Sequence, residues 1–149
     1  MTKVFFGLLL LLAIIALTGI AFAETPDMVG TWTGSATAHH EERGIIEGPD
    51  NSIIMNISEQ KGRIFYGDIQ IMNKDGTYRS EKLAGIIELS GEEFIILEHD
   101  QGISLGDFIG PDEIEIIYIE NAEGDEAGII ATNHLIRNKA ETAETAESP

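Results

Sequence analysis

The sequence predicts an all-β protein, an eight-stranded antiparallel up-and-down β-barrel that follows an N-terminal apolar signal helix. Short apolar-rich stretches recur from Val29 onward without a sustained helical period. Clusters of turn-forming residues separate these stretches, and several stretches carry one internal glycine, which permits a bend or bulge at a barrel corner. Closure removes exposed strand edges, so we favour a barrel, with a two-sheet β-sandwich as the alternative.

Each expected strand is a run of mostly aliphatic, β-branched or aromatic residues that ends at a cluster of small or turn-forming residues. Two of these clusters, 73–76 (NKDG) and 110–112 (GPD), supply the backbone conformations that tight hairpins require. The expected strands are residues 29–39, 52–59, 63–72, 79–89, 93–99, 103–109, 113–120 and 128–138.

Alternation of side chains is clearest in the third expected strand. Phe65, Gly67, Ile69 and Ile71 share one face of it, and the residues between them share the other. The first face is mostly apolar and the second mostly polar, so we expect one core-facing and one solvent-facing side. Lone glycines at Gly67, Gly85 and Gly106 interrupt three of the strands.

Two segments of the mature chain depart from the strand pattern. Residues 41–51 contain Gly44, Gly48 and Pro49, and are expected to form a long loop that covers one opening of the barrel. Residues 139–149 repeat Glu-Thr-Ala and offer nothing to bury, so we expect a disordered acidic tail.

The first 23 residues are expected to be a secretory signal peptide. Lys3 supplies the positive start, residues 4–23 form the apolar run, and the run ends in Ala-Phe-Ala, which fits the cleavage pattern. An uncleaved membrane anchor formed by residues 4–23 is the alternative, and it would be the chain's one membrane contact. In both cases the barrel domain, residues 24–138, is placed outside the cytoplasm, either secreted or associated with the cell envelope.

Composition excludes several classes of function and of stabilisation. The formal net charge is −17, which repels phosphate backbones, so nucleic-acid binding is excluded. The chain has no cysteine, so neither disulfides nor thioether-linked lipid can stabilise or anchor the domain. Stability must therefore come from apolar burial and from closure of the sheet.

The first and last strands carry a pattern that resembles the lipocalin and avidin-like (calycin) barrels. The tripeptide Gly30-Thr31-Trp32 lies on the first strand and Arg137 on the last. In those families the tryptophan packs across one barrel end and a basic residue covers its ring. The resemblance therefore implies a structural pair of Trp32 and Arg137, in cation–π contact.

Longer segments resemble a group of exported prokaryotic barrels of uncharacterised activity, so this resemblance implies a fold and a location but no chemistry. The segments are residues 29–34 (VGTWTG), 60–67 (QKGRIFYG), 85–87 (GII), 98–102 (EHDQG) and 110–118 (GPDEIEIIY).

No catalytic residue is expected. Residues 102–106 satisfy G-x-S-x-G around Ser104, but the nucleophile elbow needs a strand-to-helix turn and no helix follows here. His39 and His40 are adjacent, so on a strand they point to opposite faces. The segment Glu98-His99-Asp100 is equally consistent with a polar site and with a solvated turn.

No metal or other cofactor is expected either. Carboxylates cluster at 112–115 and at 120–126, yet neither cluster has the spacing of an EF-hand calcium loop. Charged residues at strand ends and edges also discourage pairing with other chains, which explains these clusters without a ligand.

The aromatic residues are the candidates for a ligand cavity, because an eight-stranded barrel is just wide enough to be filled by side chains or to hold one small ligand. We therefore expect an exported, non-enzymatic barrel that binds a small apolar ligand. The alternative is a packed structural or interaction protein of the cell envelope that presents acidic loops to a partner. The candidate ligand-binding residues are Trp32, Phe65, Phe94, Phe108 and Tyr118.

Overall fold

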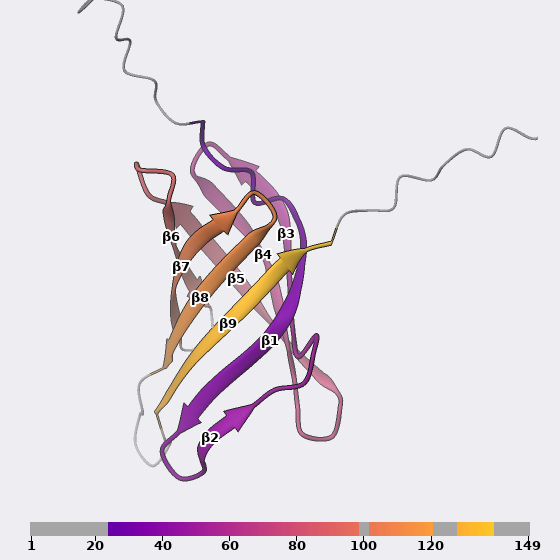
Figure 1. Cartoon of the computed structure of the whole chain (residues 1–149). Helices are drawn as coiled ribbons and strands as arrows, with labels where there is room; N and C mark the ends of the chain where they lie inside the picture. Colours follow the sequence, from indigo (N-terminus) through magenta and orange to yellow (C-terminus); the bar gives the residue numbers. More distant parts are fainter. Residues whose placement is uncertain (1–23, 99–101, 121–127, 139–149) are drawn as a thin grey trace, which may run out of the picture.

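The chain folds into a closed antiparallel barrel with one additional strand (Figure 1). The computed structural model describes residues 24–98, 102–120 and 128–138. The predicted signal peptide (1–23) and acidic tail (139–149) lie outside the described residues, and those predictions stay untested. Across the described ranges, no helix is long and apolar enough to cross a membrane.

Nine strands are described, and eight of them correspond to the predicted ones within two residues at each end. They are β1 (Gly30–His40), β2 (Gly44–Glu47), β3 (Ile53–Lys61), β4 (Ile64–Met72), β5 (Tyr78–Ile87), β6 (Glu93–Glu98), β7 (Gly102–Gly110), β8 (Glu113–Glu120) and β9 (Ile129–Arg137).

Pairing between the first and last strands closes the barrel, which confirms the predicted fold over the sandwich alternative. From β3 to β9 each strand pairs with the next one along the chain, and β1 pairs with both β3 and β9. The β1–β9 ladder runs from Trp32 opposite Arg137 to His40 opposite Ile129. In Figure 1 these two strands lie side by side across the front of the molecule.

The loop predicted at residues 41–51 was wrong in one respect, because it contains strand β2. The first part of β1 pairs with β3, from Gly30 to Gly34, whereas its last part, from Thr37 to His40, pairs with β2. A tight turn makes this hairpin: Gly44 has a φ of 71°, and Arg43 N donates to His40 O over 3.1 Å. The strand is only four residues long, too short to show alternation.

Inward-facing and outward-facing residues alternate along every barrel strand, as predicted for β4. Phe65, Gly67 and Ile69 are buried, whereas Tyr66 is exposed. The buried side chains form one apolar cluster inside the barrel. Its members are Met28, Trp32, Ile53, Met55, Ile57, Phe65, Ile69, Leu83, Ile87, Phe94, Ile96, Ile114, Ile116 and Leu135.

Strand-interior glycines make room for aromatic rings on the neighbouring strand. A Cβ atom on Gly85 would lie 2.2 Å from Cζ of Phe65, and one on Gly106 would lie 2.1 Å from Cζ of Phe94. Each ring therefore lies flat over a glycine across the ladder. Gly67 has the predicted role, since it lies opposite Ile57, where the register of β3 shifts.

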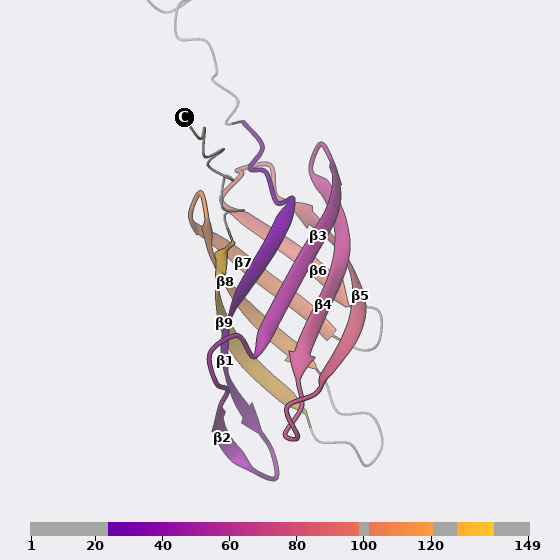
Figure 2. The same cartoon turned by 90° about the vertical axis from the view of Figure 1, so that its right-hand side faces the viewer.

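The chain's hairpins give the barrel two different ends (Figure 2). At one end β1 begins and β9 ends, so that both termini of the described barrel lie together. At the other end β1 runs into β2, and the β4–β5 turn lies nearby. We call the first of these the closed end and the second the open end.

We predict that Gly106→Ala destabilises the barrel by about 1–3 kcal/mol, because the added methyl group would overlap the buried ring of Phe94. Gly110→Ala is the matched control, since a Cβ there would meet only Cβ of Glu113, at 3.8 Å. Urea unfolding of both variants measures the difference. Equal stability of the two variants would contradict the packing role of Gly106.

Candidate functional site

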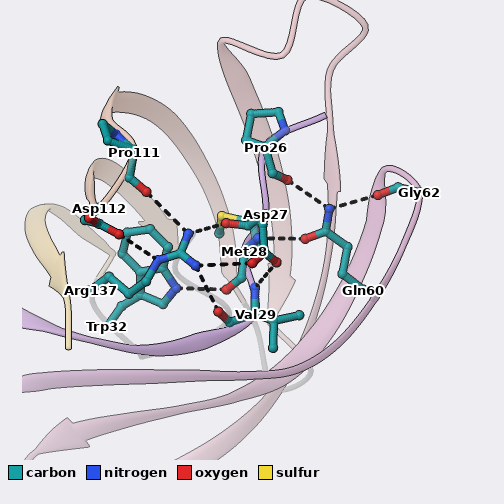
Figure 3. Close-up of polar contacts among 10 residues, drawn as sticks. All are labelled: Pro26, Asp27, Met28, Val29, Trp32, Gln60, Gly62, Pro111, Asp112 and Arg137. Carbon is teal, nitrogen blue, oxygen red and sulfur yellow. Dashed lines mark hydrogen bonds and ion pairs between the residues drawn. The ribbon is translucent and has the colours of Figure 1, made fainter. Parts of the chain in front are cut away.

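The N-terminal segment that precedes β1 covers the closed end of the barrel (Figure 3). Met28 and Trp32 are both fully buried there. The indole Nε1 of Trp32 donates to Met28 O over 2.9 Å, and Met28 N donates to Oε1 of Gln60 over 2.7 Å. Gln60 also donates through Nε2 to Pro26 O, so the segment is tied to the end of β3.

Arg137 holds this cover in place. Its guanidinium carbon lies 4.4 Å from the centroid of the Trp32 ring, the arrangement expected of a cation–π contact. Nη1 donates to Val29 O over 3.0 Å, and Nη2 donates to the carbonyl of Asp27. Nε forms an ion pair with Oδ1 of Asp112 at 3.4 Å, which adds the β7–β8 turn to the cluster. This end of the barrel is therefore filled.

The phenylalanines proposed as cavity residues pack against one another instead. The rings of Phe65 and Phe94 meet edge to face with centroids 6.1 Å apart, and those of Phe94 and Phe108 with centroids 5.1 Å apart. Phe65 and Phe94 are almost completely buried. Because the facing glycines accept the flat rings, these side chains fill the barrel interior. Of the five candidate residues, Tyr118 is the one that lines the cavity described next.

A cavity of about 180 Å³ lies inside the open half of the barrel. Three alanines, Ala36, Ala38 and Ala131, line it where other inner positions carry large side chains. Small side chains on the adjacent strands β1 and β9 thus leave open the kind of space that phenylalanine rings fill in the closed half of the barrel. The remaining walls are the apolar Ile53, Ile69, Ile71 and Ile129 and the polar Arg79, Glu98, Tyr118 and Asn133.

A groove of about 370 Å³ adjoins this cavity beneath β2. It shares Ala36, Ala38, Ile53 and Ile71 with the cavity, so the two spaces lie against each other. Its outer walls come from residues 46–49 on one side and from the β4–β5 turn on the other. The segment predicted as a loop over the opening therefore lines the mouth of the cavity.

Glu98 is the buried acid of this site. It is 4% exposed, and its Oε1 accepts a hydrogen bond of 2.9 Å from Oγ of Ser104. Its Oε2 has no hydrogen-bond partner within the described part of the chain. Burial raises the pKa of Glu98, and the hydrogen bond from Ser104 opposes that rise only in part.

Further charged and polar groups surround Glu98. The carboxylates of Glu81 and Glu120 raise the pKa of Glu98, and the guanidinium of Arg79 lowers it. Arg79 Nε is paired with Oε1 of Glu81 at 3.2 Å. The hydroxyl of Tyr118 donates to Oε2 of Glu120 over 2.8 Å; burial, this hydrogen bond and the nearby carboxylates raise the pKa of Tyr118 strongly. The site is thus rich in acceptors and negative charge.

The structure places the other candidate groups away from catalytic arrangements. Ser104 lies within β7, with strand on both sides, so the G-x-S-x-G match is not a nucleophile elbow. His134 pairs with Oε1 of Glu113 at 2.7 Å, and both side chains are substantially exposed. In ranges 24–98, 102–120 and 128–138, no three His, Asp or Glu residues are grouped as metal ligands. His99, Asp100 and the cluster at 121–126 lie outside the described residues.

Sequence reasoning did not find most of the cavity. Ala36, Ala38 and Ala131 have no chemical signature, although Ala36 and Ala38 follow Trp32 at even spacing along the first strand and so share its inner face. Asn133 continues the same inner face of β9 and is 6% exposed. The sequence signal for the cavity is the presence of small and polar residues at inner-face positions, where the other residues are large and apolar.

The barrel fold, rather than the sequence, connects this chain to known proteins. No family model matches it, and no curated protein sequence matches it. A redesigned β-barrel is 15% identical with a TM-score of 0.51, over 82% of this chain and 98% of that chain. The S-type phycobiliprotein lyase CPES from Guillardia theta is 12% identical with a TM-score of 0.52, over 76% of this chain and 90% of that chain.

These likenesses show a shared β-barrel fold, which hosts unrelated functions. Neither of these two structures is described as a lipocalin or an avidin, so the resemblance to those families stays a prediction.

The raised pKa of Glu98 predicts a pH-dependent effect of Glu98→Gln. A carboxyl whose folded pKa is above its ordinary value of 4.5 contributes stability at low pH, and loses that contribution as the pH rises through the folded pKa. The variant cannot ionise, so its melting temperature relative to the wild type should rise between pH 5 and pH 8. Glu92→Gln, at an exposed position, should show no such trend. A constant difference for Glu98→Gln would contradict the burial of an ionisable group.

Proposed function

We propose that the protein is an exported, non-enzymatic barrel that binds one small ligand at its open end. The observation that carries this proposal is the cavity of about 180 Å³ inside the open half, continued by the groove beneath β2. A fully packed barrel would fill this space with side chains as it does at the closed end. The three alanines that line the cavity leave it instead.

The size and lining of the two spaces suit a small, partly apolar molecule. Ligand pockets commonly have volumes of about 300–1,000 Å³ and mix apolar walls with a few polar groups. The inner cavity alone is below that range, so a ligand would extend into the groove. Isoleucines and alanines supply the apolar walls, and Glu98, Tyr118 and Asn133 supply polar groups at the inner side.

We propose no catalytic activity because the hydroxyl of Ser104 is hydrogen-bonded to a carboxylate and not to a base. Ser104 donates to Glu98 rather than to a histidine base. Nucleophilic catalysis needs a serine next to a base that is itself oriented by a third group. Export rests on the apolar sequence of residues 4–23, ending in Ala-Phe-Ala.

A second candidate function, an interaction protein, is favoured by a different surface. We name as the outer apolar face the residues that form two adjoining rows on the outside of β5 to β9. They are Ile86, Ile95, Leu97, Ile103, Leu105, Ile117, Ile119 and Ile130. Their side chains lie exposed at 38% to 60%, except Ile117, which is half-buried. Exposed apolar patches of this kind, rimmed by polar residues, often mark interaction sites.

The occupant that we infer for the outer apolar face is a second copy of this chain. With strands about 4.8 Å apart and a rise of about 3.3 Å per residue, the face measures roughly 24 by 13 Å. Two such faces give an interface of roughly 600 Å² in total, below the about 1,200–2,000 Å² of stable specific complexes, so the dimer is expected to be weak and transient. Glu93, Asp107 and Glu115 lie opposite one another on β6, β7 and β8 at its rim, so acidic repulsion would weaken the dimer at low salt.

We predict that Ala131→Leu weakens ligand binding, because three added carbon atoms would occupy the cavity. N-Phenyl-1-naphthylamine, whose fluorescence rises in apolar sites, serves as the probe. The wild type should bind it saturably, and Ala131→Leu should bind it at least tenfold more weakly. Ala84→Leu, on the outside of β5, is the matched control and should bind as the wild type does.

Circular dichroism of each variant reports whether it remains folded, and Ala36→Leu provides a second blocked cavity if Ala131→Leu unfolds. Absence of saturable binding to the wild type, or equal binding to the blocked and control variants, would refute the proposed function.

The interaction function predicts salt-promoted self-association. Sedimentation velocity at increasing protein concentration should show a monomer at low salt and a growing dimer fraction at about 0.5 M NaCl, as screening reduces repulsion between the rims. Leu97→Lys should remove the dimer. Leu89→Lys, in the exposed β5–β6 turn, should not. A monomer under all conditions would rule out the dimer.

A further inference from the structure

From the geometry of Glu98 we infer the chemical class of the ligand: a small amphiphile whose head is an ammonium group. The head would bind the carboxylate of Glu98, and the apolar part would extend along the alanine-lined wall toward the groove beneath β2. This inference rests on the proposed function and specifies the chemistry of the same site.

One oxygen atom of the Glu98 carboxylate has no hydrogen-bond partner within the described residues. Buried polar atoms are almost always hydrogen-bonded, and leaving one unpaired costs about 1–3 kcal/mol. Ser104 satisfies Oε1, whereas Oε2 is buried and has no partner within the described residues, and Glu98 is one of the residues that line the cavity. A ligand that donates a hydrogen bond to Oε2 would remove this deficit.

The charge around Glu98 is mainly negative. Among the described residues whose charge acts on Glu98, Glu81 and Glu120 are acidic and Arg79 is basic. Arg79 is already paired with Glu81. Within the described residues, the carboxylate of Glu98, which lines the cavity, and the nearby carboxylate of Glu120 therefore share one guanidinium that is already paired with Glu81. A negative site of this kind attracts a cation and repels an anionic head such as a fatty-acid carboxylate.

The hydroxyl groups near Glu98 are not free to donate hydrogen bonds to a ligand with an anionic or acceptor head. An anionic or acceptor head would require free N–H or O–H groups at the inner wall. The hydroxyl of Tyr118 donates to Glu120, and that of Ser104 donates to Glu98. Both hydroxyl donors near Glu98 are thus committed to carboxylates. An ammonium group carries three donors and no acceptor, which fits the carboxylate of Glu98. Arg79 and Asn133 also line the cavity and carry N–H donors, so probes with acceptor heads are needed to test the competing preference.

The apolar part of the ligand is limited by the walls. Ala36, Ala38 and Ala131 are small, and the isoleucines beside them expose only aliphatic carbon to the cavity. The inner space of about 180 Å³ suits a chain of about six carbons, with longer substituents lying in the groove. A linear or singly branched alkylamine is the simplest molecule of this kind.

A matched series of six-carbon probes tests the inference on the purified full chain. Isothermal titration calorimetry at pH 7.5 would compare hexylamine, 1-hexanol and hexanoate, which have six carbon atoms each and differ in the charge and chemistry of the head group. Hexylamine should bind at least tenfold more tightly than 1-hexanol, and hexanoate should bind most weakly. Glu98→Gln should weaken hexylamine at least tenfold and change 1-hexanol less than threefold. Glu92→Gln is the control and should change neither.

The outcomes separate this inference from the proposed function. If 1-hexanol and N-phenyl-1-naphthylamine bind but hexylamine is not preferred, or if Glu98→Gln leaves hexylamine binding unchanged, the ammonium inference is wrong and the binding function stands. If none of these probes binds, the proposed function itself fails. Preferential binding of hexanoate would overturn the charge argument directly.

Discussion

The hydrogen-bonded ladder between β1 and β9 is the constraint on which the rest of the structure depends. It pairs the strand that begins the domain with the strand that ends it, over nine residue pairs from Trp32–Arg137 to His40–Ile129. Closure fixes the barrel's width, so each inward position must either fill a given volume or leave it empty. In a chain without cysteine, no disulfide can join the first and last strands of the barrel, so this ladder holds them together.

Closure also explains why the two halves of the barrel differ. In the closed half, phenylalanine rings lie over Gly85 and Gly106, and the Trp32–Arg137 cluster covers the end. Buried side chains therefore fill the interior of this half and stabilise the fold. In the open half, small side chains take the inward positions of β1 and β9, and polar groups replace aliphatic ones. The same alternation thus yields a packed core and an open cavity, according to the size of the inward residue at each level.

The fold could be predicted from the sequence because its signals are local. Alternation and turn clusters located all eight barrel strands, whereas β2 was missed because four residues are too few to show a period. The position of Trp32 beside Arg137 followed from a recognisable pattern. The cavity could not be predicted in this way, because Ala38 and Ala131 are brought opposite each other only by the β1–β9 register. The aromatic candidates lie mostly in the half of the barrel that their own rings fill.

The cost of Glu98 to the fold supports the binding role that we propose for the open half. A carboxylate that is 4% exposed, with one oxygen unpartnered in the described structure, destabilises the folded state wherever it is ionised. Ser104 offsets only part of this, and Glu81 and Glu120 add to it. An aliphatic residue at the end of β6 would continue the core formed by Phe94 and Ile96. The cationic head that we propose for the ligand would change this balance, because the buried carboxylate would then form an ion pair.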